Sequence, residues 1–346
     1  MLATRENIAT MFARQDLVLL GIASLGPEQD YSRFQNWLAQ GNHAGMEYME
    51  RYGHLRQDPR GLLEGARTAL SFAWRYGPAS NTDEGSSVAK YARLPDYHKW
   101  MRRRGDLVWR EIQALIPSDT NPQARVCVDT APLLERSLAS RTRGPFIGKN
   151  TCLIHPDLGS FLLLGHILTT LDLLPDEQSA VDPQARTPQG GCGTCKRCQV
   201  HCPTGALDQD YRLNANLCLS YWTIEHRGPI PIRFWPYLSR YWYGCDICQD
   251  VCPYNRVGSI HVEPSRVRDL DLVDVATMNQ LRYEQLFGGT PMTRAGRHGL
   301  RRNALIALFV RKDPRLKTAI TNNPADHPTV RATILEMISQ RPELGD

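Results

Sequence analysis

The chain of 346 residues is long enough for about two domains with cores of their own. Hydrophobic residues make up 42% and charged residues 22%, a composition typical of globular proteins, and the formal net charge is only +5. No apolar run reaches the roughly 18 residues of a membrane span. The N-terminus lacks the basic-then-apolar order of a signal peptide, so we expect a soluble, cytoplasmic protein.

The first half of the chain alternates between strand and helix patterns. Strands are predicted at 16–25, 66–77 and 124–129, and helices at 31–41, 96–116 and 132–141, the last with Pro132 in its first turn. A hairpin is predicted across 148–168, with its turn at 155–159. This alternation predicts an α/β sheet layered with helices, which we assign to a first domain at 1–184.

A cysteine-rich segment follows, assigned to 185–262. Eight of the ten cysteines lie between 192 and 252, in a chain without a secretion signal, which favours metal ligands over a disulfide framework. The stretch GCGTCKRCQVHCPTG has the C-x2-C-x2-C-x3-C-P spacing of a bacterial ferredoxin. The later stretch YGCDICQDVCPYN lacks the first cysteine of such a run, since Trp242 stands there, and Cys218 lies between the runs to replace it.

In two-cluster ferredoxins the fourth cysteine of each run ligates the other cluster. Applied here, the crossing predicts two 4Fe-4S clusters. One would be held by Cys192, Cys195, Cys198 and Cys252, and the other by Cys245, Cys248, Cys202 and Cys218. Structural zinc is the alternative, but zinc takes four ligands, whereas each run supplies three closely spaced thiolates and a Cys-Pro. Cys127 and Cys152 stand in apolar contexts and are assigned no chemistry.

The last segment, 263–346, has amphipathic helix patterns and no strand signals. Paired helices stacked like HEAT repeats fit this pattern. Arg294, Arg297 and Arg301 fall three and four residues apart and share one helix face. That face can be a solvated surface or one that follows nucleic-acid phosphates, and the basic stretch at 100–106 has the same two interpretations.

Two residues of the first domain could carry chemistry. Asp129 follows a strand and precedes a helix, so it can cap that helix or act as an acid if burial keeps it protonated. His98 lies in DYHKWM, which nearly matches the D-x-H-x-x-G pattern of cobalamin enzymes that ligate cobalt through histidine. Met101 replaces the glycine, so the motif fails. A lone histidine on a helix is more often a surface or hydrogen-bonding residue.

Together these stretches resemble epoxyqueuosine reductases, the cobalamin-dependent iron–sulfur enzymes of tRNA queuosine synthesis. The resemblance covers nearly the whole chain. It is carried by YARLPDYHKWMRRR, VDTAPLLERSLASRTRGPFIGKNTCLIHPDLGSF, GCGTCKRCQVHCPTGAL, LCLSYWTIEHRGPIP, YGCDICQDVCPYNR and HGLRRNALIAL. It implies a nitroreductase-like α/β cobalamin-binding module, a ferredoxin-like module and HEAT-like helices.

The resemblance also implies a reaction. Electrons pass through the two clusters to cobalamin, and reduced cobalt attacks, or transfers electrons to, the epoxide of epoxyqueuosine at the wobble position of a tRNA anticodon. Asp129 matches the family's proton donor. The implied cofactor contacts are Arg51, Tyr97, His98, Asp129, Ser220 and Asp246.

The implied partners are a tRNA that carries epoxyqueuosine and a low-potential electron donor of the ferredoxin or flavodoxin type, with the enzyme acting as a monomer. Candidate phosphate contacts are Arg102 to Arg104 with Arg294, Arg297 and Arg301, and Trp222, Trp235 and Tyr237 could stack on bases. Two alternatives remain at this point: a two-cluster electron-transfer protein without cobalamin, and a corrinoid reductive dehalogenase.

Overall fold

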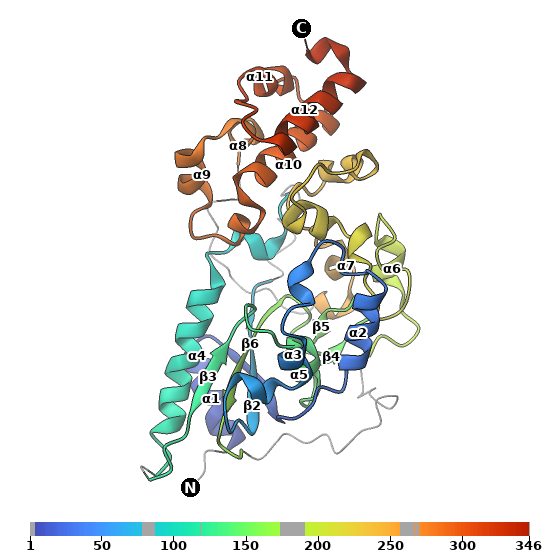
Figure 1. The fold of residues 1–346 in the computed structure, drawn as a ribbon. Helices are drawn as coiled ribbons and strands as arrows, with labels where there is room; N and C mark the ends of the chain where they lie inside the picture. The colour runs from blue at the N-terminus through green and yellow to red at the C-terminus, as the bar shows by residue number, and fades with distance from the viewer. Residues whose placement is uncertain are drawn as a thin grey trace.

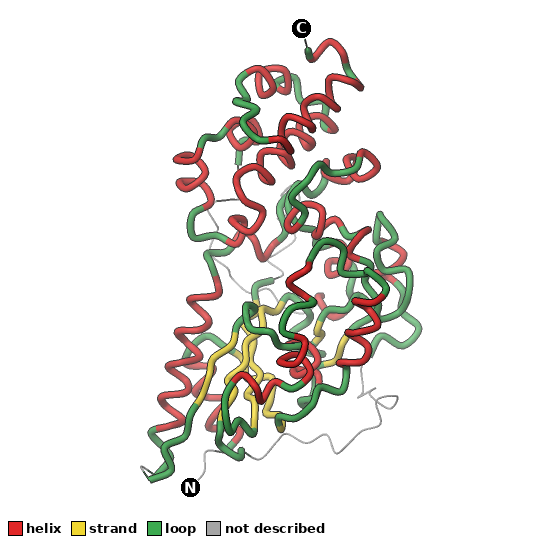
Figure 2. The backbone as a smooth tube through the Cα atoms, viewed as in Figure 1, coloured by secondary structure: helices red, strands yellow, loops and turns green. Residues whose placement is uncertain are grey.

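The structure, a computed structural model, describes residues 4–77, 87–117, 119–173, 191–256, 267 and 270–345. A sheet module lies at one end of the molecule and a group of helices at the other, with the cysteine-rich segment beside the sheet module (Figure 1). Figure 2 shows that the strands gather in the sheet module and that loops dominate the cysteine-rich segment. No helix among the described residues combines the length and apolar character needed to cross a membrane.

The main sheet has four strands in the order β1-β2-β6-β3. Their bounds are Val18–Ser24 for β1, Thr68–Arg75 for β2, Ala124–Cys127 for β3 and Leu162–Thr169 for β6. β2 pairs with β6 over its whole length, from Thr68 opposite Thr169 to Arg75 opposite Leu162. Every pair in this sheet is antiparallel. The alternation of helices and strands was predicted correctly, but these strands do not form the parallel sheet of an α/β fold in the strict sense.

Helices cover both faces of the sheet, which explains why β2 is buried at every residue from Thr68 to Ala73 rather than at alternate residues. On one face, Leu70 and Phe72 of β2 pack with α1 (Arg5–Arg14) and α4 (Tyr97–Gln113). On the other face, Ala69 and Ala73 lie in the clusters that include residues of α5 (Glu135–Ser140). The remaining helices of this module are α2 (Tyr31–Ala39) and α3 (Gly53–Gln57).

Two glycines let α4 and β6 approach the sheet core closely. A Cβ atom on Gly105 of α4 would lie 2.8 Å from the Val126 side chain, and one on Gly165 of β6 would lie 2.4 Å from the Phe72 ring. Gly105 weakens the helix locally, by about 1 kcal/mol relative to alanine. Glycine is needed at this position because α4 packs closely against β3.

Two local predictions in this module are wrong. The helix expected from Pro132 begins only at Glu135, with Leu134 as its N-cap and no capping side chain. The predicted hairpin does not form: β5 (Leu153–Ile154) pairs with β4 (Phe146–Ile147), whereas β6 joins the main sheet. The turn at 155–159 is nevertheless present, closed by a bridge between His155 and Gly159.

The cysteine-rich segment contains only short helical elements. In its described residues they are α6 (Arg197–His201), a π-helix at Tyr221–Glu225, 3₁₀ helices at Ala215–Leu217, Ile232–Ser239 and Pro253–Arg256, and α7 (Ile247–Asp250). The ends of this segment lie outside the described residues, and so do the predicted domain boundaries at 184/185 and 262/263. The division into three domains therefore stays a prediction.

The described C-terminal region has five α-helices, with α8, α11 and α12 packed against α10. These are α8 (Leu272–Thr277), α9 (Gln280–Phe287), α10 (Gly296–Val310), α11 (Leu316–Thr321) and α12 (Pro328–Gln340). Nearly every residue of α10 from Gly299 to Phe309 is buried, including Arg301 and Arg302. Its core is continuous with Trp235, Trp242 and Tyr243 of the cysteine-rich segment, so the two regions share one hydrophobic cluster.

Candidate active site and cluster-binding segment

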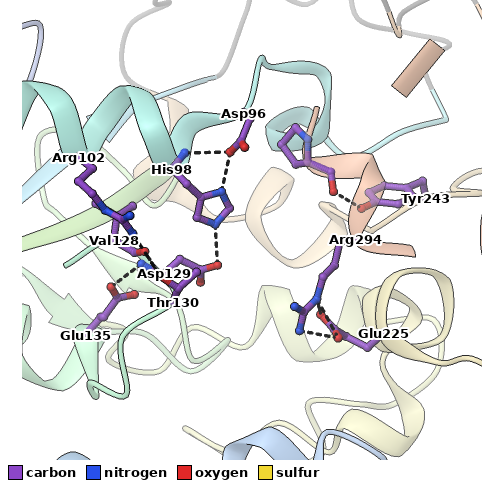
Figure 3. A network of polar contacts seen from close by, with 11 residues as sticks. Asp96, His98, Arg102, Val128, Asp129, Thr130, Glu135, Glu225, Tyr243 and Arg294 are labelled. Carbon is purple, nitrogen blue, oxygen red and sulfur yellow. Dashed lines mark hydrogen bonds and ion pairs between the residues drawn. The ribbon is translucent and has the colours of Figure 1, made fainter. Parts of the chain in front are cut away.

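The path of the chain brings Asp129 close to the N-terminal end of α4. Helix α4 runs for 17 residues, about 25 Å at 1.5 Å per residue, and β3 then returns along it. Asp129 follows β3 and lies beside His98 in the first turn of α4, where Asp129 Oδ2 and His98 Nε2 are 2.9 Å apart. The same ring contacts Asp96 Oδ1 through Nδ1 at 2.7 Å, so His98 joins two carboxylates (Figure 3).

The backbone at Asp129 is held in an unusual conformation. Its φ is 56°, in the left-handed region that non-glycine residues other than Asn and Asp rarely adopt. Its N–H donates to Glu135 Oε1 at 2.9 Å, while its side chain remains 59% exposed. Asp129 therefore does not cap α5, and its carboxylate points away from that helix toward His98.

Glu135 gives this site a second acid that the sequence analysis missed. Burial raises the pKa of Glu135 to about 8, and the neighbouring Asp129 carboxylate adds to the increase. A glutamate with this pKa is mostly protonated at neutral pH and still accepts the Asp129 N–H through its carbonyl oxygen. No local pattern marks Glu135 as unusual, because its environment depends on the turn after β3.

The thiols of Cys192, Cys195, Cys198 and Cys252 line one cavity of about 250 Å³, together with Lys149, Asn150 and Tyr254. Within the described ranges, no three candidate ligands converge as a single metal ion would require. Thiols spread around a cavity suit a cube with four separate irons better than one tetrahedral zinc. Burial raises the pKa of the Cys252 thiol to about 11, so binding of iron must displace the thiol protons.

Lys149 connects this cavity to the sheet module. Its backbone N–H donates to Cys192 Sγ at 3.4 Å, and its buried ammonium donates to the Gly193 carbonyl at 2.9 Å. Asp210 pairs with the ammonium at 3.1 Å. A cation and an N–H donor beside a thiolate are the groups that raise the reduction potential of an iron–sulfur cluster.

The second predicted set of ligands also lies together. The thiols of Cys202, Cys218, Cys245 and Cys248 are close enough to influence one another's ionisation. Burial raises the pKa of the Cys218 thiol, while the nearby N–H groups of Ser220 and Tyr221 and the Ser220 hydroxyl oppose that increase. All ten cysteines are free thiols. Cys152, which was assigned no chemistry, lies close enough to Cys248 for the two thiols to influence each other's ionisation.

Comparisons with known proteins identify the family. Residues 191–255 match the family described as a 4Fe-4S double cluster binding domain, and residues 56–130 match the family described as "Epoxyqueuosine reductase QueG, DUF1730". The epoxyqueuosine reductase of Cyclobacterium marinum is 34% identical over 281 residues, which cover 80% of this chain and 87% of the relative. The chain belongs to the epoxyqueuosine reductase family.

Solved structures of epoxyqueuosine reductases share the fold of the whole chain. The enzyme from Streptococcus thermophilus superposes with a TM-score of 0.84 at 25% identity and covers 98% of this chain and 90% of its own. A second epoxyqueuosine reductase, solved with an epoxyqueuosine-modified stem loop of tyrosine tRNA, gives a TM-score of 0.83 at 25% identity. It covers 99% of this chain and 90% of its own.

The cofactor contacts implied by the epoxyqueuosine reductase resemblance lie in different environments. Tyr97 is buried with its ring stacked on His98 at 4.1 Å, and Arg51 is exposed in the turn before α3. Asp246 is 2% exposed and accepts the Lys90 N–H at 2.7 Å; burial raises its pKa to about 6. Ser220 contacts Cys218, as described above.

Several residues expected to contact tRNA have structural roles instead. The Arg301 guanidinium is fully buried and pairs with Asp326, which also pairs with Arg297 at 2.9 Å. Trp235 is 3% exposed within the core, so it cannot stack on an unpaired base. The sequence spacing of Arg297 and Arg301 was consistent with an exposed surface. The α10 face that these two arginines share instead packs against neighbouring helices. Arg102 and Arg103 are exposed, and Arg294 pairs with Glu225 at 3.0 Å (Figure 3).

Proposed function

We propose that the protein reduces epoxyqueuosine to queuosine at the wobble position of tRNA, with two 4Fe-4S clusters and cobalamin as cofactors. The observation that carries this proposal is the half-exposed Asp129 carboxylate, held in a left-handed turn against His98, in a chain that shares its fold with epoxyqueuosine reductases. Asp129 serves as the proton donor to the oxygen that leaves the substrate. A general acid of this kind typically contributes 10²–10⁴-fold to the rate.

The surroundings of Asp129 suit a large planar cofactor. Tyr48 is 40% exposed, so part of its aromatic side chain is accessible. Tyr48 lies near enough to Asp129 to respond to its charge, and its ring contacts the Arg294 guanidinium at 5.1 Å. Both nitrogens of His98 are engaged by carboxylates, so this histidine has no free nitrogen to ligate cobalt.

Bound cobalamin would supply the low-valent cobalt chemistry that opens the epoxide, and the clusters would supply its electrons. We assign Cys192, Cys195, Cys198 and Cys252 to one cluster and Cys202, Cys218, Cys245 and Cys248 to the other. Arg51, Tyr97, His98, Asp129, Ser220 and Asp246 remain candidate cobalamin contacts, with Ser220 also supporting a cluster ligand. A soluble ferredoxin or flavodoxin is the proposed electron donor, and the cytoplasm, where tRNA is found, is the proposed location.

The fold details follow the same proposal. We assign the sheet module to a nitroreductase-like cobalamin-binding domain at 1–184, the cysteine-rich segment to a ferredoxin-like domain at 185–262, and the C-terminal helices to a HEAT-like domain at 263–346. The protein is proposed to act as a monomer. Arg102 and Arg103, exposed on the first turns of α4, are its candidate phosphate contacts near the site.

The test is anaerobic reconstitution with iron, sulfide and cobalamin, followed by incubation with epoxyqueuosine-containing tRNA and a low-potential reductant. Nucleoside mass analysis should show the loss of one oxygen from the modified base. A preparation that holds both clusters and cobalamin but leaves epoxyqueuosine intact would contradict the proposal. A preparation that holds clusters but binds no cobalamin would indicate an electron carrier instead.

A further inference from the structure

His98 lies between two carboxylates and both of its ring nitrogens are used. Asp96 Oδ1 is 2.7 Å from Nδ1, and Asp129 Oδ2 is 2.9 Å from Nε2 (Figure 3). Asp129 is placed at the end of this chain of three groups, on the exposed side. The sequence resemblance implies only a cofactor contact for His98, which does not explain why a second carboxylate lies behind the ring.

Asp96 sets the tautomer of the imidazole. It is the N-cap of α4, and the same Oδ1 atom accepts the backbone N–H of His98 at 3.0 Å. An ionised carboxylate can only accept hydrogen bonds, so Nδ1 must carry a hydrogen and donate it to Asp96. The Tyr97 ring, stacked on the imidazole at 4.1 Å, holds the plane of the ring. His98 therefore presents Nε2 to Asp129 in a fixed orientation.

One proton then has to lie between Asp129 and His98. Either Asp129 is protonated and donates to Nε2, or Nε2 is protonated and donates to Asp129. The two arrangements differ only in the position of this proton, and the distance of 2.9 Å allows its transfer in either direction. We propose that His98, oriented by Asp96, is the relay that stores this proton and reprotonates Asp129 during the reaction.

This relay rests on the proposed function, and its steps balance as follows. His98 Nε2–H passes the shared proton to Asp129, which releases it to the epoxide oxygen as a carbon–oxygen bond breaks, so that His98 is left neutral and Asp129 ionised. Solvent reprotonates His98, whose side chain is 28% exposed. Two such transfers, with two electrons from the external low-potential donor, convert the epoxide to an alkene and water.

The charges around the relay favour a stored proton. Those that surround it are Asp96, Lys99, Asp129, Glu135 and Arg102, with the phenols of Tyr97 and Tyr48. The hydrogen bond to Asp129 raises the pKa of His98, with a further increase from Asp96, although burial acts in the opposite direction. Because the pKa is raised, His98 keeps its proton to higher pH than a free histidine and loses it as the pH rises through that value.

The experiment compares His98→Gln and Asp96→Asn with wild type in single-turnover oxygen loss across pH 5–9. We expect His98→Gln, assayed with cobalamin bound as judged by its absorption spectrum, to lower the rate constant about 10–100-fold and to abolish the alkaline limb that His98 controls. His98→Ala should recover part of the rate when imidazole is added. His43→Gln is the matched control, because His43 Nε2 also contacts a carboxylate, Glu50, at 3.1 Å; it should keep the wild-type rate and pH profile.

A second measurement needs neither clusters nor cobalamin. In ¹⁵N-histidine-labelled protein, the His98 signals should show a protonated Nδ1 throughout and an Nε2 that titrates, and Asp129→Asn should lower the midpoint of that titration. An unprotonated Nδ1, or a midpoint unaffected by Asp129→Asn, would overturn the relay. So would a cobalamin-loaded His98→Gln variant that turns over like wild type. If wild type fails to convert tRNA, the proposed function fails, and the ¹⁵N titration still decides the proton network.

Discussion

Two groups of charged residues in this molecule differ in how completely their charges are paired. In α10, Arg301 and Arg302 are fully buried, and their guanidinium groups are matched by Asp326, two asparagines and backbone carbonyls. Around His98, two carboxylates contact one imidazole and a third acid, Glu135, accepts the Asp129 N–H; within the described part of the chain no lysine or arginine forms an ion pair with Asp129. Charged groups with complete hydrogen-bond and ion-pair partners stabilise the packing. Charged groups with incomplete partners have perturbed pKa values, which a proton-transfer reaction can use.

Arg302 shows how a buried charge with complete hydrogen-bond partners contributes to the fold. Among the described residues no carboxylate pairs with it; it donates to the carbonyls of Trp222, His226 and Gly228 at 2.6–2.9 Å. These carbonyls belong to the chain that follows Cys218, a proposed cluster ligand, so Arg302 ties the C-terminal helices to the cysteine-rich segment. Its neighbour Asn303 donates to the Thr223 carbonyl at 2.8 Å and extends the same connection.

The largest effect is expected for Arg302→Met. The substitution keeps the side-chain length but leaves several buried carbonyls without donors, so it should lower the free energy of unfolding by about 3–5 kcal/mol. Urea unfolding under anaerobic conditions measures this change. Lys317→Met, on the exposed surface of α11, is the control and should change stability by less than about 0.5 kcal/mol. A loss below about 1 kcal/mol for Arg302→Met would show that the network is not structural.

Asp129→Asn should have the converse effect, on activity rather than stability. Loss of the proton donor should lower the single-turnover rate about 10²–10⁴-fold, equivalent to about 3–5 kcal/mol in the activation barrier. Stability should not fall, because the change removes a negative charge beside Glu135. The matched control is Asp16→Asn, since Asp16 is another exposed aspartate with a positive φ, 54°. If both variants lose activity equally, or Asp129→Asn is fully active, the assignment of Asp129 is wrong.

The pairing of Lys149 is intermediate between these two groups: its ammonium is buried, and its carboxylate partner, Asp210, is half-exposed. Lys149→Met should lower the reduction potential of the adjacent cluster by tens of millivolts, on the order of 1 kcal/mol, because the cation favours the reduced, more negative form. Redox titration followed by EPR measures it. Lys99→Met, on α4 and away from the cysteines, should leave both potentials unchanged. A potential that does not move, or that rises, would exclude this role.

The sequence allowed prediction of what depends on local spacing. The grouping of the cysteines came from two short runs, and strand β2 and helix α4 came from apolar periodicity. What could not be predicted depends on partners far along the chain. The contact of His98 with Asp129 joins residues 31 apart, and the helical spacing of Arg297 and Arg301 is the same whether their face meets solvent or Asp326. The strand at 162–169 pairs with β2 over its full length and therefore does not form the predicted hairpin.

Glu135→Gln tests the poorly paired acids around His98 by pH alone. The pKa of Glu135 is about 8 in the folded protein, against 4.5 for an ordinary glutamate, so the folded state binds the proton more tightly. The stability from this group is present at low pH and is lost as the pH rises from about 5 through 8. Glutamine keeps the acceptor for the Asp129 N–H and does not ionise, so the stability of the variant relative to wild type should rise by about 1 kcal/mol for each pH unit between about pH 5 and 8. Glu64→Gln, at an exposed site, should show no such pH dependence. A Glu135→Gln stability curve parallel to wild type would mean that Glu135 is already ionised at neutral pH. Asp129 would then stand beside a full negative charge, and the two carboxylates would be compensated by the His98 imidazolium and, at Glu135, by Arg136.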